Sequence, residues 1–348
     1  TTETHNNVSA SLAYNFSRGD STTDGEFSIN SFLSNGVRVD WADQSFGELI
    51  TCVLLGGDIE ARVVSATFTG GAAPDTRTVA HGLGGAPEVI LAFCRVAFGT
   101  QTSIGAWDGS GYAHFTTYSA NAGAVTDIYS RVETTGIVAP KATSTPSFTA
   151  TLTNVGASNF DVQTDTPNSR TIYFLCLRGT SGAIVAKTGV FDTPTSTGDS
   201  AVVSGMSAAP QLLLAIPTRQ TATGNVTGDD AGAFGLIAAA TNTGTQYGGV
   251  TASEDDGADP SVSKSQSTNS QALRVLDITG AADIEATVSS WDSGGVTLNF
   301  SNINASARKI PYLAFGVAVA AGGGQPKMIR TMAVPGIRLG GQKFGRGF

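Results

Sequence analysis

The stretch SEDDGADP gathers four carboxylates within six residues, Glu254, Asp255, Asp256 and Asp259. Ca²⁺ prefers clusters of hard oxygen ligands of this kind, so these residues are the candidate ligands of a surface Ca²⁺ site. Their spacing does not match the twelve-residue EF-hand loop. A solvated acidic loop without a metal is the favoured interpretation, and the sequence indicates no other cofactor.

Two aromatic residues in the stretch GAWDGSGY are a second candidate site. Trp107 and Tyr112 lie in a loop-like segment, where their rings could stack on a sugar. The alternative is that they pack against the core. Trp41 is expected to do so, because it is in phase with the apolar residues Val37 and Val39.

The sequence contains none of the motifs that usually mark catalysis. The three histidines, His5, His81 and His114, share no local motif, and the chain has no HExxH, GxSxG, Walker or CxxC pattern. A glycan-degrading enzyme would need two acidic residues about 5–10 Å apart, and the sequence indicates no carboxylate pair in such an arrangement. We therefore expect a non-enzymatic protein, with a glycan-degrading spike as a rival hypothesis.

The three cysteines are scattered, and each lies inside an apolar run. Cys52, Cys94 and Cys176 are therefore expected to be buried free thiols, because a disulfide framework or a zinc site would need a different spacing. Free thiols suit assembly in a reducing cytoplasm.

The composition favours strands and tight turns over helices. Only 14% of the 348 residues are charged, against about 25% in an average globular protein, and 43 are glycine. The net charge of −8 argues against nucleic-acid binding. No apolar run approaches the ~20 residues of a membrane span. The chain starts at Thr1 without an initiator Met, as a processed or shortened chain would.

One phrase is written twice along the chain. HGLGGAPEVILAF (81–93) and SGMSAAPQLLLAI (204–216) share a Gly in the second place, Ala-Pro in the sixth and seventh, and a closing apolar run. Gly82 and Gly205 are expected to adopt a backbone angle that a Cβ disfavours. The prolines are expected at strand entrances, where a missing N–H is tolerated.

A second unit occurs three times, at 27–57, 148–179 and 284–317. Each copy has two alternating stretches joined by a Gly/Ser/Asn turn, followed by an almost unbroken apolar run. Alternation predicts a strand with one buried face, and an unbroken run predicts a strand covered on both faces.

The order of these units predicts an all-β chain of tandem, jelly-roll-like β-sandwiches. The expected domains are an N-terminal half β-sandwich (1–58), β-sandwich repeat 1 (59–180), β-sandwich repeat 2 (181–320) and an extended tail (321–348). Because an unpaired sheet edge is avoided, the half-sandwich needs further strands. They are expected from sequence beyond this chain or from a neighbouring subunit.

The tail concentrates positive charge in an otherwise acidic chain. It carries five cations and no acid, namely Lys327, Arg330, Arg338, Lys343 and Arg346. Because the stretch MIRTMAVPGIRL also contains many apolar residues, a docking segment that orders against a partner is favoured. The alternative is a solvated terminus.

The repeated strand entries and the closing strands, such as ARKIPYLAFGVA, resemble those of virion structural proteins of tailed bacteriophages, of the tail-fibre, baseplate-associated or head-decorating type. This resemblance implies a non-enzymatic virion component that is assembled in the host cytoplasm. Its expected partners are further copies of itself and other virion proteins. The C-terminal tail is expected to dock onto these other virion proteins. The alternative function is a carbohydrate-binding or adhesive module that contacts a host surface glycan.

Overall fold

The computed structural model describes residues 14–17, 23–33, 36–44, 50–55, 58–95, 102–122, 125–140, 148–166, 169–180, 183–225, 232–242, 244, 246–253, 263–277, 280–318 and 329–334. These residues form strands and turns and contain no helix. The described part therefore holds no apolar helix long enough to cross a membrane.

The chain divides into two compact units. The larger unit, Leu55–Thr331, contains two β-sandwiches, which we call repeat 1 (β5 to β13) and repeat 2 (β14 to β24). The smaller unit combines Thr1–Leu54 with Met332–Phe348. The all-β, tandem-sandwich fold predicted from the sequence is confirmed, whereas the predicted domain limits stay predictions.

Each repeat has one large sheet. In repeat 1 the strand order is β17 (Gly224–Asn225), β10 (Val125–Glu133), β9 (Tyr112–Ala122), β8 (Thr102–Trp107), β7 (Val89–Arg95), β13 (Ser169–Gly179) and β5 (Ile59–Thr69). In repeat 2 it is β14 (Ile184–Asp192), β24 (Lys309–Val317), β16 (Leu212–Ala215), β18 (Gly232–Thr241), β19 (Gln246–Ser253) and β20 (Ser263–Thr268).

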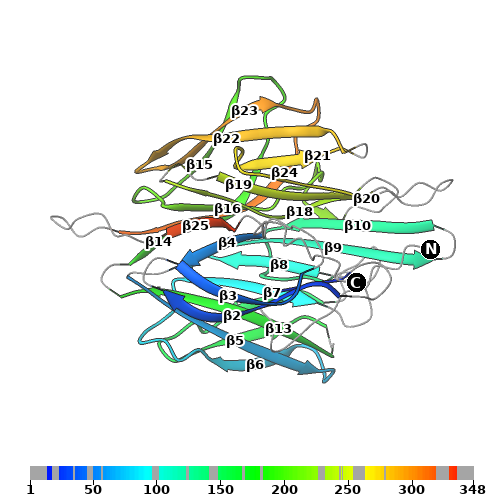
Figure 1. Ribbon diagram of the computed structural model, residues 1–348. Helices are drawn as coiled ribbons and strands as arrows, with labels where there is room; N and C mark the ends of the chain where they lie inside the picture. The colour runs from blue at the N-terminus through cyan, green and yellow to red at the C-terminus, as the bar shows by residue number, and fades with distance from the viewer. Residues whose placement is uncertain are drawn as a thin grey trace, which may run out of the picture. The chain divides into compact units, whose positions relative to one another are not determined.

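A small sheet completes each sandwich. In repeat 1 it consists of β11 (Ala150–Thr153), β12 (Asn159–Thr164) and β6 (Asp75–Ala80). In repeat 2 it consists of β15 (Ser200–Ser204), β23 (Gly295–Asn302), β22 (Ala282–Asp292) and β21 (Leu273–Leu276). Figure 1 shows β22 and β23, in gold and orange, stacked over the large sheet of repeat 2.

The large sheets of the two repeats have the same topology, whereas the small sheet of repeat 2 has one strand more than that of repeat 1. With the two-residue β17 set aside, each large sheet runs in the order first, last, third, fourth, fifth and sixth strand of its repeat. In each repeat the first strand pairs with the last in the large sheet, and the second pairs with the second-last in the small sheet. These paired strands pass together from one sheet to the other, as in a jelly roll. Like-built sandwiches are what the repeated phrases predict.

Burial follows the sequence pattern. Exposed and buried residues alternate along β15, whereas every residue of the unbroken apolar strand β16 is buried. The core of repeat 1 includes Phe68, Phe148, Phe160 and Phe174, each at most 1% exposed. Apolar area removed from water in this way is the main stabilising contribution to each sandwich.

The repeated phrase has a common structural role in both repeats. Gly82 and Gly205 have φ angles of +66° and +86°, as expected for a turn that favours glycine. Immediately before the apolar strand, Glu88 and Gln211 hold equivalent positions, and the backbone N–H of each donates to the closing strand at 2.9 Å. A side-chain oxygen of each also accepts a backbone N–H from the end of that strand.

The smaller unit contains part of the same design. Its sheet β1 (Tyr14–Ser17), β2 (Thr23–Leu33) and β3 (Gly36–Gln44) has the order of β21, β22 and β23. The next strand, β4 (Ile50–Leu55), pairs with β25 (Ile329–Val334) from the predicted tail. A partner of the half-sandwich therefore comes from this chain itself, a source that the sequence did not suggest.

Candidate functional site

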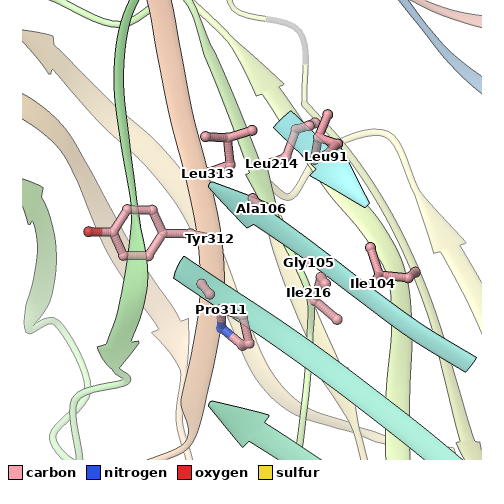
Figure 2. A pocket seen from close by; sticks show the side chains of 10 residues that line it. Leu91, Ile104, Gly105, Ala106, Leu214, Ile216, Pro311, Tyr312 and Leu313 are labelled. Carbon is pink, nitrogen blue, oxygen red and sulfur yellow. The ribbon is translucent and has the colours of Figure 1, made fainter. Parts of the chain in front are cut away.

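The most developed site among the described residues is the interface between the two repeats. The large sheets face each other with the surfaces that are turned away from their own small sheets, which we call the outer faces. A small apolar crevice, partly open to solvent, lies between them. Figure 2 shows Leu91 of repeat 1 beside Leu214 of repeat 2 and Ile104 on the side of Ile216, while the Tyr312 ring points away from them.

A buried apolar cluster lies in the same interface. Phe115 and Val132 of repeat 1 and Ile216 of repeat 2 are at most 8% exposed, and Ile104 and Val190 pack against them. The two sandwiches are therefore joined by buried apolar side chains as well as by the linker. This contact explains why β16 and β24 are apolar on both faces.

A carboxylate joins the β8–β9 turn of repeat 1 to the edge strand of repeat 2. Asp108 Oδ1 accepts the backbone N–H groups of Ser110 and Gly111 at 2.9 and 2.8 Å. Its Oδ2 accepts the backbone N–H of Thr188 in β14 at 2.8 Å. The side chain thus shapes its own turn and binds an otherwise unpaired strand edge.

The charge of Asp108 affects its surroundings. Burial alone would raise the pKa of Asp108, but hydrogen bonds from Thr188, Ser110 and Gly111 outweigh burial and hold the pKa below its ordinary value. The pKa of Tyr312 is raised to about 12, first by burial and then by the negative charge of Asp108. Asp108 therefore stays ionised and Tyr312 neutral near neutral pH.

A second carboxylate holds the connection between the repeats. Glu88 Oε2 accepts the N–H of Gly179, at the end of β13, and that of Ile184, at the start of β14, both at 2.8 Å. Gln211, the equivalent residue of repeat 2, accepts the N–H of Val317 at 3.4 Å. The repeated phrase therefore has an additional role in repeat 1, because its Glu88 also binds the first strand of the next sandwich.

Polar contacts close the opposite side of the interface. The Gln220 amide donates to the Ser130 hydroxyl, and both side chains are buried. In addition, β17 pairs with β10 and so adds a piece of repeat 2 to the large sheet of repeat 1. The two sandwiches share main-chain hydrogen bonds as well as apolar area.

The candidate glycan-stacking residues lie side by side, but both contact the core. Trp107 and Tyr112 are directly opposite each other in the β8–β9 pair and are partly buried against the core of repeat 1. The Tyr112 hydroxyl donates to the Leu152 carbonyl at 3.0 Å and accepts the Leu152 N–H at 3.1 Å. Tyr112 therefore satisfies the backbone hydrogen-bonding groups of Leu152 on the edge strand β11. Glycan stacking stays a prediction.

The other predicted site residues lie mostly outside the described part. This holds for the acidic loop of Glu254, Asp255, Asp256 and Asp259, and for all the tail cations except Arg330, which is in β25. In the described ranges, no three His, Cys, Asp or Glu side chains gather as a metal site. The Ca²⁺ site and tail docking therefore stay predictions.

Two of the three cysteines are as predicted. Cys94 and Cys176 are free and buried, and burial raises the pKa of each thiol to about 12. The side chain of Cys52 lies outside the described residues. Thiols with so high a pKa stay protonated and inert at neutral pH.

His114 is fully buried and has a structural hydrogen bond. Its Nδ1 lies 2.7 Å from the Gly136 carbonyl, and because a carbonyl only accepts, Nδ1 carries the proton. Nε2 is buried without a hydrogen-bond partner. Burial lowers the pKa of His114 to about 4. The imidazole is therefore neutral near neutral pH and packs inside repeat 1.

Comparison of the chain with protein-family models, with curated proteins and with solved structures finds no match. The interface itself was missed from the sequence. Glu88 follows the Pro of the repeated phrase and Asp108 opens a Gly-rich turn, so both stand beside recognised signals. Neither signal says that a carboxylate will bind the next sandwich.

Proposed function

We propose that this chain is a non-enzymatic structural component of a bacteriophage virion, a fibre, tail or capsid-associated protein. The observation that supports the proposal most is the repeat architecture: two sandwiches whose large sheets share one strand order are joined face to face. The carboxylates Glu88 and Asp108 are engaged by backbone N–H groups across the junction. Such an arrangement makes a rigid building block.

The assignment to a phage particle rests on the resemblance of the strand entries and closing strands to those of phage structural proteins. Homo-oligomerisation and docking to other virion proteins through the tail belong to the same proposal. The pairing of β25 with β4 bears on the tail, because it gives residues 329–334 a place in a sheet of this chain. The basic residues beyond β25 would then be the part available to a neighbour.

The test is the composition of purified particles. Virions from the cells that make this protein should contain the chain in a fixed copy number per particle, measured by quantitative peptide mass spectrometry. A chain that stays in the soluble fraction and is absent from gradient-purified particles would refute the proposal. Particles from a deletion strain, complemented with the intact gene, are the control.

Two deletions separate the roles of the tail. Removal of 335–348 leaves β25 in place, and it should abolish incorporation into particles while the purified chain still unfolds at the wild-type temperature. Removal of 323–348 also takes away the partner of β4 and should lower the melting temperature. If the shorter deletion is incorporated at normal occupancy, the docking role of the basic tail is wrong.

The alternative, a glycan-binding module, has one observation in its favour. Trp107 and Tyr112 form a cross-strand pair whose side chains are partly exposed. Binding on a broad glycan array that disappears in Trp107→Ala would support it. Tyr112→Phe is the matched control, because it keeps the ring and loses the hydrogen bonds to Leu152.

A further inference from the structure

The first strand of repeat 1 is a long sheet edge. β5 has eleven residues and lies at the end of the large sheet, where β13 is its strand partner. The longest other edge strand of the two sandwiches, β14, has nine residues. β5 contains no proline, and its register with β13 runs without a bulge from Ile59 to Thr69. A long, regular edge of this kind is a template for another strand.

The equivalent edge in repeat 2 is occupied. By their register with the closing strand, Ile59 and Val63 of β5 correspond to Ile184 and Thr188 of β14. The backbone N–H groups of Ile184 and Thr188 point away from β24 and donate to two carboxylates of repeat 1. Because the hydrogen-bonding direction alternates along an antiparallel strand, Val63 and every second residue on either side of it direct their N–H and C=O groups to the open side of β5.

The residues that direct these groups outward are exposed to solvent. Val63 is 72% exposed, the highest value among the large apolar side chains of the described residues. Ala61, Ser65 and Thr67 are exposed as well. The exposed Arg62 side chain donates to the Ala61 carbonyl at 3.1 Å, and a surface arginine can leave such a contact. The edge is therefore accessible to a partner strand.

The side chains of β5 suit pairing with another strand. On the outer face, the residues from 61 to 69 are Ala, Val, Ser, Thr and Thr, which are small or β-branched and carry no charge. The two charged residues of the strand, Glu60 and Arg62, form an ion pair with each other at 3.5 Å. Natural proteins often protect an edge with unpaired charge, and the middle of β5 has none.

An antiparallel pairing centred on Val63 makes the strand complementary to itself. About a two-fold axis at that residue, Val63 lies opposite its own copy, Ala61 lies opposite Ser65, and the two strands overlap from 59 to 67. Arg62 then lies opposite Val64, so no like charges face each other. This matters because like charges directly opposite each other destabilise a strand pair.

The same pairing extends an apolar row that begins at the interface between the repeats. Leu91, which lines the crevice, lies opposite Leu175, and Leu175 lies opposite Val63. The two-fold axis continues this row into the second copy through the same three residues in reverse order. Tyr173 and Phe93, which are 48% and 41% exposed and lie opposite each other, form the adjacent row on this face. Apolar cross-strand pairs of this kind stabilise a sheet.

We propose that the open edge of β5 pairs with β5 of a second copy of this chain, antiparallel and about a two-fold axis at Val63, so that two large sheets become one. The contact is isologous, so each copy uses its edge on the other and assembly through it stops at a dimer. Main-chain hydrogen bonds supply affinity, as they do when an extended peptide adds a strand to a sheet edge.

The first test is sedimentation velocity of the purified full chain over a wide concentration range. The weight-average mass of the wild type should rise from that of one chain towards that of two. Val63→Lys places two ammonium groups opposite each other and should weaken the dissociation constant more than about tenfold. Val202→Lys is the matched control, because Val202 is a 57% exposed valine on β15, and it should associate as the wild type does.

The second test is a charge exchange at the proposed axis. Val63→Lys and Val63→Glu should each be monomeric alone, because each puts like charges opposite each other. An equimolar mixture should form one-to-one heterodimers, seen by native mass spectrometry, because opposite charges then face each other. Circular dichroism first checks that both variants are folded, which the 72% exposure of Val63 favours.

The third test needs no substitution. In the wild type, the backbone amides of Val63 and Ser65 should exchange hydrogen rapidly in dilute solution and slowly at concentrations where the dimer forms. Exchange in β15 should not depend on concentration.

A wild type that is monomeric at every concentration would overturn the proposal. A dimer whose β5 amides stay unprotected, normal association of Val63→Lys, or a charge-exchange mixture that stays monomeric would overturn it as well. These outcomes are independent of the proposed virion role, which depends on particle composition and not on self-association of the purified chain.

Discussion

The Asp108 carboxylate of repeat 1 accepts the backbone N–H of Thr188 in repeat 2 at 2.8 Å. This hydrogen bond joins a turn of one sandwich to the edge strand of the next. Because the same carboxylate also organises its own turn, the shape of the turn and the docking of the sandwiches depend on one side chain. The interface is thus polar at its rim and apolar at its centre.

Replacing Asp108 by Asn should lower the free energy of unfolding by about 2 kcal/mol. The amide has one acceptor oxygen, so it cannot serve both the turn and Thr188, and its NH₂ faces a donor. Urea denaturation at pH 7 measures the loss. Ser110→Ala is the control, because it removes only an exposed hydroxyl contact and should change stability by less than about 0.5 kcal/mol.

The effect of Asp108→Asn should depend on pH. A carboxylate whose pKa is depressed in the folded state stabilises the fold above its unfolded pKa, and that stability is lost as pH falls through the folded pKa. The difference between wild type and variant should therefore shrink in acid. A difference that stays constant from neutral to acidic pH would contradict the role assigned to the charge.

Glu88 should tolerate glutamine but not alanine. Gln211 fills the equivalent position in repeat 2, so Glu88→Gln keeps an acceptor for Gly179 and Ile184 and should cost less than about 1 kcal/mol. Glu88→Ala leaves both N–H groups without this partner and should cost about 2–3 kcal/mol. Faster amide hydrogen exchange at Ile184 in Glu88→Ala alone would locate the effect at the linker.

His114 should make the fold sensitive to mild acid. The unfolded chain takes up a proton near pH 6.5, whereas the folded imidazole does so near pH 4. The free energy of unfolding should therefore fall by about 3 kcal/mol between these pH values and level off below them. His114→Gln keeps a donor for Gly136 without titrating, so its stability should depend less on pH, as followed by chemical denaturation at several pH values.

Gly105 should not accept any side chain. A Cβ at this position would lie 1.6 Å from the Ile137 carbonyl oxygen, because the segment around Ile137 packs directly against β8, where the Ala139 N–H also donates to Ser103. Gly105→Ala should cost at least about 3 kcal/mol or prevent folding. Gly294→Ala is the matched control, since a Cβ there meets nothing within 4 Å, and its melting temperature should stay close to the wild-type value.

Periodicity in the sequence was sufficient to predict the strands of the repeated units and which of their faces are buried. Alternation in β6, β12 and β15 matches one buried face, and the turn glycines Gly82 and Gly205 have the positive φ that their position implied. These features are local, because the pleat and the turn depend on neighbouring residues. The repeated phrases predicted equal topology for the same reason, since like segments fold alike.

What covers each outer face was decided by tertiary structure alone. The apolar runs of β13 and β24 look alike in the sequence, yet Tyr173 is exposed and Pro311 is buried. The pairing of β4 with β25 likewise joins segments from opposite ends of the chain. Burial of a strand on its second face depends on which sandwich packs there, and that is a long-range property that no local pattern encodes.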